Sequence, residues 1–302
     1  MDIPVTPGPI APIAPVAPGA ASPVSERAQA RRETLRVLFR RPAFIIGCVV
    51  VLGWVVTAIL GDRITPYDPF NDFAAGHQPP STEHLFGTDR LGRDILSRVM
   101  VGSRDVLIVA PLAALLGVSV GTLLGLIMGY YRGTIDDVLS RLVEAFLALP
   151  VILVALLTLV VLGSSPAVVV CVVGILFTPI VARTVRSAVL SERQLDYVTA
   201  AKLRGESGLF ILSREIFPNV LGPTVVELTV RFGYAIFTVA TLSFLGVGIQ
   251  PPSPDWGLAV SEEYTNMISG IWWPTFFPAL AIASTVIAVN LIADSLQSVL
   301  TE

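Results

Sequence analysis

The stretch YVTAAKLRGESGLFILSREIFPNVLGP (residues 197–223) separates two long apolar segments of the chain. It contains the only lysine, Lys202, together with two arginines and two glutamates. Charged side chains are costly in the apolar core of a bilayer, so this polar segment is predicted to lie outside the membrane. Its apolar residues recur at roughly helical intervals and are interrupted by Gly205 and Gly208. This pattern predicts two short helices joined by a glycine turn.

Two further features of the polar segment concern its end and its surface. Pro218 is expected to end the second short helix, and Asn219 to cap the membrane helix that follows. The small pair Ala200–Ala201 would allow another protein to approach closely. On these residues alone, a solvated loop between membrane helices is the simpler interpretation.

The composition on either side of this segment is that of a membrane protein. The 302 residues are 53% hydrophobic and only 14% charged, whereas soluble domains carry about 25% charged residues. A helix needs roughly 17–25 apolar residues to cross a bilayer. Six segments meet this length, which predicts an all-α protein with six transmembrane helices, at about residues 43–60, 106–130, 142–162, 167–189, 221–247 and 275–296.

The distribution of basic residues predicts the orientation of these helices. With both termini in the cytoplasm, 14 of the 20 arginine and lysine residues fall on the cytoplasmic side. Five lie outside, all in the first outer loop, and Arg231 lies within a span. Cytoplasmic loops carry the excess of basic residues, so this orientation is favoured and the polar segment is placed in the cytoplasm.

The chain divides into a tail and a membrane domain. Residues 1–35 begin with a Pro/Ala-rich stretch that is expected to be a disordered cytoplasmic tail. Residues 36–302 form the six-helix domain, with an outer loop at 62–105, a cytoplasmic loop at 190–220 and a second outer loop at 250–274.

The two outer loops carry charged residues whose roles are open. The first contains an amphipathic helix after Asp94, suited to the membrane surface or to the side of the bundle. Its alternating charges around Asp89 and Arg93 suggest a salt-bridged scaffold, with contact to an outer partner as the alternative. Glu262 and Glu263 of the second loop are expected to face solvent, or else a docking partner.

Glu227 and Arg231 are the unusual ionisable residues inside a predicted span. They are four residues apart with the glutamate first, the order that favours an ion pair on a helix. A lone charge at mid-bilayer costs about 3 kcal/mol or more, so the two are expected to neutralise each other. A structural ion pair and a lining of a translocation path both remain open.

Several function classes lack their motifs in this sequence. There is no G-x-x-x-x-G-K-[ST] phosphate-binding loop and no H-E-x-x-H. The two histidines both lie in the first outer loop without a matching ligand set, and no metal or cofactor is expected. The net charge of −3 gives no reason to expect nucleic acid. We see no internal repeat of the kind that ion-driven secondary carriers use.

Four motifs resemble a known family. The run TAAKLRGESGLFILSREIFPN (residues 199–219) looks like the cytoplasmic signature of ABC-importer permeases. Three more motifs make the chain similar to the C-type permease subunit of dipeptide, oligopeptide and nickel importers. They are FGTDRLGRDILSRVMVGSR (residues 86–104), GYYRGTIDDVLSRLVEAFLALP (129–150) and LSFLGVGIQPPSPDWG (242–257), and the resemblance extends from about Arg36 to the C-terminus.

The resemblance implies a type I ABC-importer permease in the bacterial inner membrane, which is not itself an enzyme. Its implied partners are a second, B-type permease, two ABC ATPases at the cytoplasmic face, and an extracytoplasmic peptide-binding protein. The implied ATPase-coupling residues are Thr199, Ala200, Ala201, Lys202, Arg204, Gly205, Glu206 and Ser207. The outer-loop motif comprises Gly87, Thr88, Asp89, Gly92, Arg93 and Asp94.

The sequence departs from the family pattern at the coupling segment, and the cargo stays open. Thr199 stands where a glutamate is frequent, Glu215 where a histidine is expected, and Phe217 where a leucine usually precedes the proline. The expected cargo is a dipeptide or oligopeptide, with glutathione or a nickel chelate as alternatives.

Overall fold

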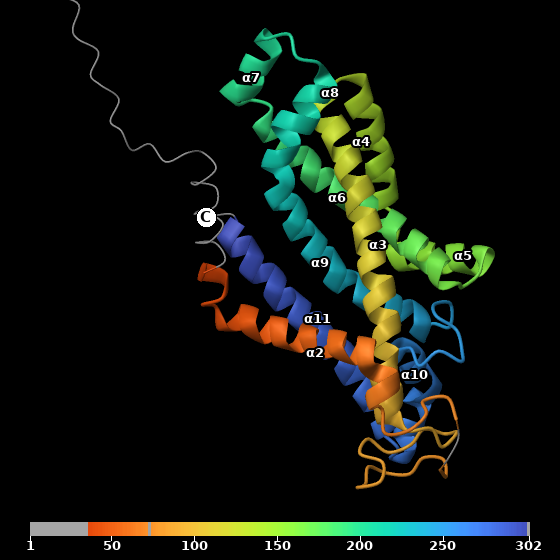
Figure 1. The fold of residues 1–302 in the computed structure, drawn as a ribbon. Helices are drawn as coiled ribbons and strands as arrows, with labels where there is room; N and C mark the ends of the chain where they lie inside the picture. Colours follow the sequence, from red (N-terminus) through yellow and green to blue (C-terminus); the bar gives the residue numbers. More distant parts are fainter. Residues whose placement is uncertain (1–35, 72–73, 301–302) are drawn as a thin grey trace, which may run out of the picture.

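The computed structural model describes residues 36–71 and 74–300, so the predicted tail lies outside the described residues. All elements of regular structure in these ranges are helical (Figure 1). In chain order they are α2 (Pro42–Ile64), α3 (Ile95–Tyr131), α4 (Thr134–Leu147), α5 (Val151–Leu162), α6 (Pro166–Glu192), α7 (Asp196–Leu203), α8 (Gly208–Phe210), η1 (Ile211–Ile216), α9 (Phe217–Phe244), α10 (Trp256–Glu263), η2 (Tyr264–Ser269) and α11 (Trp273–Leu300).

Five of the six predicted spans are present as continuous helices in the described residues. Helices α2, α3, α6 and α11, and the helical run from Gly208 to Phe244, are each long and apolar enough to cross a membrane. The third predicted span, residues 142–162, is wrong as a single helix. Helices α4 and α5 meet at 86°, and they make a sixth crossing only if the bent pair counts as one. Pro150 explains the break, because proline has no backbone N–H and disfavours the helical conformation of the residue before it.

The amphipathic helix predicted in the first outer loop is not a separate element. It is the first turns of α3, which runs without interruption for 37 residues. Asp94 begins this helix by accepting a hydrogen bond from the Ser97 backbone N–H. Ile95 and Arg98 are both buried, so this part of α3 packs against the bundle rather than lying on a membrane surface.

The polar segment also differs from its prediction at Pro218. The chain stays helical from Gly208 to Phe244, so Pro218 does not end a helix. The turn before it, η1, is a π-helical turn, the kind of widened turn that accommodates an interruption in the hydrogen-bond ladder. Asn219 does not cap α9, and its side-chain amide donates to the carbonyl of Glu215 and to the Tyr197 hydroxyl oxygen.

The most extensive helix–helix contact in the described chain joins α3 to α6. Four glycines of α3, at every fourth position, face α6: Gly117, Gly121, Gly125 and Gly129. A Cβ added at Gly121 would lie 2.6 Å from Val181 Cβ and 2.8 Å from the Thr178 carbonyl oxygen. Small residues at four-residue spacing let two membrane helices approach closely enough for van der Waals contact along their length. This stripe therefore sets the distance between α3 and α6.

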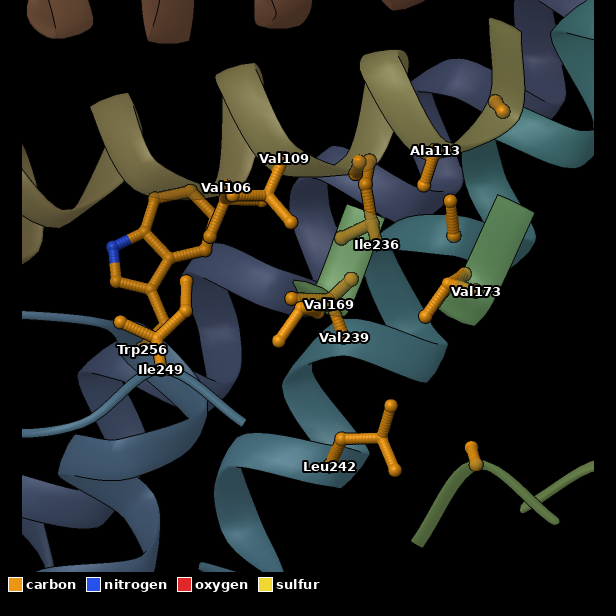
Figure 2. Close-up of a cluster of buried hydrophobic side chains, with 14 of the residues drawn as sticks. Val106, Val109, Ala113, Val169, Val173, Ile236, Val239, Leu242, Ile249 and Trp256 are labelled. Carbon is orange, nitrogen blue, oxygen red and sulfur yellow. The ribbon is translucent and has the colours of Figure 1, made fainter. Parts of the chain in front are cut away.

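A buried apolar cluster continues from this contact toward the far end of α3 (Figure 2). Val106 and Val109 of α3 meet Val169 of α6 and Val239 of α9 there. Trp256, at the start of α10, is fully buried, and its indole N–H donates to the Val99 carbonyl at 2.8 Å. The cluster thus joins three membrane helices to the short helix α10.

Helices α2 and α11 form a second group beside this core. They pack on each other and also contact α3 and α9, and Trp54 Nε1 donates to Ser284 Oγ at 3.1 Å. Figure 1 shows α7 at one end of the long helix α3, and α10 with the loop that precedes α3 at the other. We call these the elbow end and the loop end of the bundle.

A larger side chain at a glycine of this stripe should destabilise the fold. We expect Gly121→Val to lower the free energy of unfolding by about 1–3 kcal/mol, because the new side chain meets α6 backbone and cannot be accommodated without displacement. The matched control is Gly53→Val on α2, where an added Cβ meets no atom within 4 Å. Thermal unfolding in detergent measures both. Equal melting temperatures for the two variants would contradict the close contact.

Candidate functional site

The three groups of predicted site residues are separated along the bundle. The coupling residues 199–207 lie at the elbow end, and the outer-loop residues 87–94 lie at the loop end (Figure 1). Glu227 and Arg231 belong to α9, which lies between them. The three groups lie on different elements, so each is described on its own.

The elbow (residues 196–207) consists of α7 and the turn after it. Val198 and Ala201 are fully buried and pack against Val189, Ile211 and Ile216. The prediction that both alanines are open to another protein is therefore wrong for Ala201. Its methyl group holds α7 against the bundle, whereas Ala200 is exposed.

The turn of the elbow has a defined geometry. Gly205 adopts φ +79°, a conformation that side chains rarely allow. Its N–H bonds to the Lys202 carbonyl, and the Glu206 N–H bonds to the Ala201 carbonyl, which closes the end of α7. Leu203 is 85% exposed and Leu209 is 72% exposed, one on each side of this turn. The elbow thus presents two apolar side chains outward from a fixed turn.

Aromatic side chains anchor the elbow to the ends of the membrane helices. The Tyr197 hydroxyl donates to Glu192 Oε2 at 2.6 Å, and burial together with this carboxylate raises the pKa of Tyr197 to about 12. Lys202 Nζ lies 5.9 Å from the centroid of the Tyr130 ring, at the end of α3. Tyr197 and Lys202 thus connect α7 to the ends of α6 and α3, respectively.

Glu215, which departs from the family pattern, pairs with Arg204 in the same region. Arg204 Nη2 lies 3.3 Å from Glu215 Oε1, and Arg204 Nε lies 3.8 Å from Glu206. These side chains are partly exposed, so the pairs add little stability. They do fix the orientation of the Arg204 side chain, which the sequence alone does not indicate.

The outer-loop residues fold back on themselves at the loop end. Asp89 Oδ2 accepts from Arg93 Nε at 2.7 Å, and its Oδ1 accepts from the Arg93 backbone N–H. Gly92 has φ +79°, and a Cβ there would lie 2.0 Å from the Ala74 carbonyl oxygen. Thr88 Oγ1 donates to the Ala75 carbonyl. The ion pair of the salt-bridged scaffold expected around Asp89 and Arg93 is therefore confirmed.

The two outer loops are also tied to each other. Glu262 Oε2 lies 3.4 Å from Arg93 Nη2, across the two loops. Glu263 is only 2% exposed, and it accepts from the Arg90 backbone N–H at 2.9 Å and contacts His77 Nε2 at 3.0 Å. The expectation that both glutamates face solvent is wrong for Glu263. Sequence alone does not reveal this, because the partners precede Glu263 by more than 170 residues.

A buried carboxylate at the loop end was not predicted from sequence. Asp255 begins α10 by accepting from the Leu258 backbone N–H at 2.9 Å, and it is fully buried. Its Oδ2 has no hydrogen-bond partner among the described residues. Burial raises the pKa of Asp255 to about 6, and the charge of Asp105 acts in the same direction. The signal in the sequence is an aspartate directly before a helix start.

The charged residues within α9 form the predicted pair. Arg231 Nε donates to Glu227 Oε2 at 2.9 Å, and the side chains are 12% and 14% exposed. The Arg231 guanidinium also lies 5.0 Å from the centroid of the Tyr234 ring. In the described part of the chain, no group of three or more His, Cys, Asp or Glu side chains is placed to hold a metal ion.

Comparison with protein families gives this architecture its context. Residues 121–302 match the model of the binding-protein-dependent transport system inner membrane component. The chain belongs to this family. Residues 30–80 of the permease also match the N-terminal transmembrane domain of oligopeptide transport permease C. Proteins of this family are transport permeases and not, in general, catalytic.

Curated relatives cover most of the permease. A putative peptide transport system permease of Brucella suis is 40% identical over 268 residues, covering 88% of this chain and 90% of the relative. A glutathione transport system permease of Pectobacterium atrosepticum is 38% identical, with 89% and 90% covered. A dipeptide transport system permease of Bacillus subtilis is 34% identical, with 89% and 84% covered.

The raised pKa of the buried Asp255 predicts that the stability of the fold depends on pH. Its folded-state pKa of about 6 lies above the value of 3.8 for an unperturbed aspartate, so its stabilising contribution is present in acid and is lost as pH rises through 6. Between pH 5 and pH 7.5 this group alone should cost the fold on the order of 1 kcal/mol. Asn is also a good helix cap, so Asp255→Asn should remove this loss.

Melting temperatures of wild type and Asp255→Asn, measured in detergent at both pH values, test the point. All other ionisable groups are common to the two proteins and drop out of the comparison. The variant should gain stability relative to wild type as pH rises. A difference that does not change with pH would contradict the assignment to Asp255.

Proposed function

We propose that the permease is one of two membrane subunits of an ABC importer for dipeptides or oligopeptides, with its termini and its elbow in the cytoplasm. The observation that supports this most directly is the family match together with relatives named as peptide, dipeptide and glutathione permeases. Glutathione is itself a tripeptide, so it is a second candidate cargo within the same class. A nickel chelate is a weaker candidate, since none of these three relatives is named for nickel.

The proposed partners at the elbow end are two ATPase subunits. Exposed residues of the elbow would contact an ATPase: Thr199, Ala200, Lys202, Arg204, Gly205 and Ser207, with the half-buried Glu206 orienting Arg204. Leu203 and Leu209 supply the apolar surface of this contact. Ala201 contributes by holding α7 in place. ATP is bound and hydrolysed by these partners, since the permease carries no phosphate-binding loop.

The proposed partner at the loop end is an extracytoplasmic peptide-binding protein. The outer-loop residues Gly87–Asp94 and their ties to Glu262 and Glu263 make a stiff surface there. A second permease is proposed to form the other half of the channel. Movement reaches from one end to the other through continuous helices: the run from Gly208 to Phe244 has 37 residues, or about 55 Å at ~1.5 Å per residue.

Coupling of ATP hydrolysis to uptake tests the assignment of the elbow. We expect Leu203→Glu to leave the fold intact, because this side chain is 85% exposed, but to weaken ATPase binding by tenfold or more through an unpaired charge in an apolar contact. The measurement is co-purification of the ATPases together with peptide-stimulated ATP hydrolysis.

The control introduces a glutamate at an exposed apolar residue of the loop end. Ile268 lies in η2 and is 94% exposed; Ile268→Glu adds the same charge far from the elbow and should leave ATPase binding unchanged. If Leu203→Glu retains full coupling, the ATPase does not dock on the elbow.

A further inference from the structure

One face of α9 is polar along the middle of the membrane-spanning helix. Glu227, Arg231, Tyr234, Thr238 and Thr241 follow one another at spacings of four, three, four and three residues. With 3.6 residues per turn, these positions lie within one narrow arc of the helix. From Glu227 to Thr241, every position in this arc carries a polar group. The Thr241 hydroxyl is satisfied by the Phe237 carbonyl within the helix, so the charged pair is the part of this face that needs a polar neighbour.

The polar face of α9 is distinct from the two faces by which α9 packs. Phe232, Ile236 and Val239 turn into the core shared with α3 and α6. Gly233 turns toward α11, where an added Cβ would lie 2.8 Å from Asn290 Oδ1. The polar face lies between these contacts, and Tyr234 is 55% exposed on it. Thr238 is buried and the side chains of Glu227 and Arg231 are only 14% and 12% exposed, so the described part of the chain leaves this face open chiefly at Tyr234.

Lipid is not a suitable neighbour for this face. The Glu227–Arg231 pair neutralises its net charge, but a guanidinium has five N–H donors. Among the described residues, Arg231 makes no hydrogen bond or ion pair other than the one from Nε to Glu227. The remaining donors need acceptors, and hydrocarbon offers none.

A hollow adjoins the polar face on the elbow side. It lies between α3 and the start of α9 and has a volume of about 700 Å³. Thr224, one turn before Glu227, lines it, as does Thr122 of α3. Thr122 Oγ1 is buried and has no hydrogen-bond partner among the described residues. Thr224 donates to the Val220 carbonyl within its own helix, so Thr122 is the unsatisfied polar group of this mostly apolar hollow.

We propose that this face of α9 lines the route of the peptide, and that Glu227 and Arg231 together set how the permease tolerates charged peptides. The inference rests on the proposed function, because it requires a peptide as cargo. A self-neutralised pair offers a carboxylate to an ammonium group and N–H donors to a carboxylate or a backbone carbonyl. It holds neither sign of charge strongly, which suits a passage that must release what it binds.

Neutralising each member of the pair should change selectivity in opposite directions. In Glu227→Gln the positive charge of Arg231 is uncompensated, so uptake of lysylalanine should fall about tenfold relative to dialanine. In Arg231→Gln the negative charge of Glu227 remains, so uptake of glutamylalanine should fall by a similar factor. The assay is ATP-driven uptake of each labelled dipeptide by the complete importer in vesicles, at saturating binding protein.

A structural ion pair elsewhere in the chain gives the matched control. Asp136 and Arg186 join α4 to α6, with Arg186 Nε 2.6 Å from Asp136 Oδ1. Asp136→Asn should lower uptake of all three dipeptides by the same factor, after correction for the amount of folded importer. The same uniform pattern in Glu227→Gln and Arg231→Gln would reduce their pair to a structural role and overturn the proposal.

Water access to the polar face gives a second readout. In a permease with Cys48→Ala and Cys171→Ala, Tyr234→Cys should react with a membrane-impermeant thiol reagent during ATP turnover, and excess dialanine should slow the reaction. Ile59→Cys, at a side chain 75% exposed on the apolar helix α2, should stay unlabelled. Equal absence of labelling at both positions would contradict a water-filled route at α9.

The two proposals fail in different ways. If the unmodified importer takes up none of the three dipeptides, the proposed cargo is wrong. If it takes them up but the variants show no opposite charge selectivity, only the role of the α9 face is wrong.

Discussion

The close contact between α3 and α6 is the constraint on which the rest of the structure depends. In a bilayer the hydrophobic effect does not drive helices together, so contact must come from packing. The glycines from Gly117 to Gly129 remove the side chains that would keep the two backbones apart, and the contact extends over about three turns of α3. Once α3 and α6 are joined, their far ends present a fixed surface on which α9 and α10 pack.

The elbow and the outer loops are both attached to this joined pair of helices. At one end, Tyr130 of α3 and Val189 of α6 contact α7. At the other, Val99 of α3 accepts the hydrogen bond of Trp256, and Arg93, just before α3, pairs with Glu262. An ATPase moving the elbow would therefore act on a rigid body that also carries the loops facing the binding protein. We propose this arrangement as the physical basis of coupling.

The sequence predicted the parts of this molecule that depend on local chemistry. Apolar length located the membrane helices, and the spacing of Glu227 and Arg231 predicted the ion pair that the structure contains. The glycine repeat of α3 is also readable in the sequence, although it does not say which helix it meets. Pro150 was readable as a break, but the apolar residues around it suggested a single span.

The parts that could not be predicted depend on contacts between distant segments. Glu263 looked like a solvent-facing residue because its partners, His77 and Arg90, precede it by more than 170 residues. Ala201 looked accessible because its burial depends on Ile211 and Ile216 folding back over α7. Pro218 looked like a helix end because nothing local indicates the π-helical turn that carries the helix through it.

The most direct measurement is uptake of a labelled dipeptide by vesicles that contain this permease, its partner permease and the ATPases, with binding protein outside. The account predicts accumulation that requires both ATP and the binding protein and that persists when ion gradients are dissipated. Accumulation driven by an ion gradient in the absence of the ATPases would contradict it.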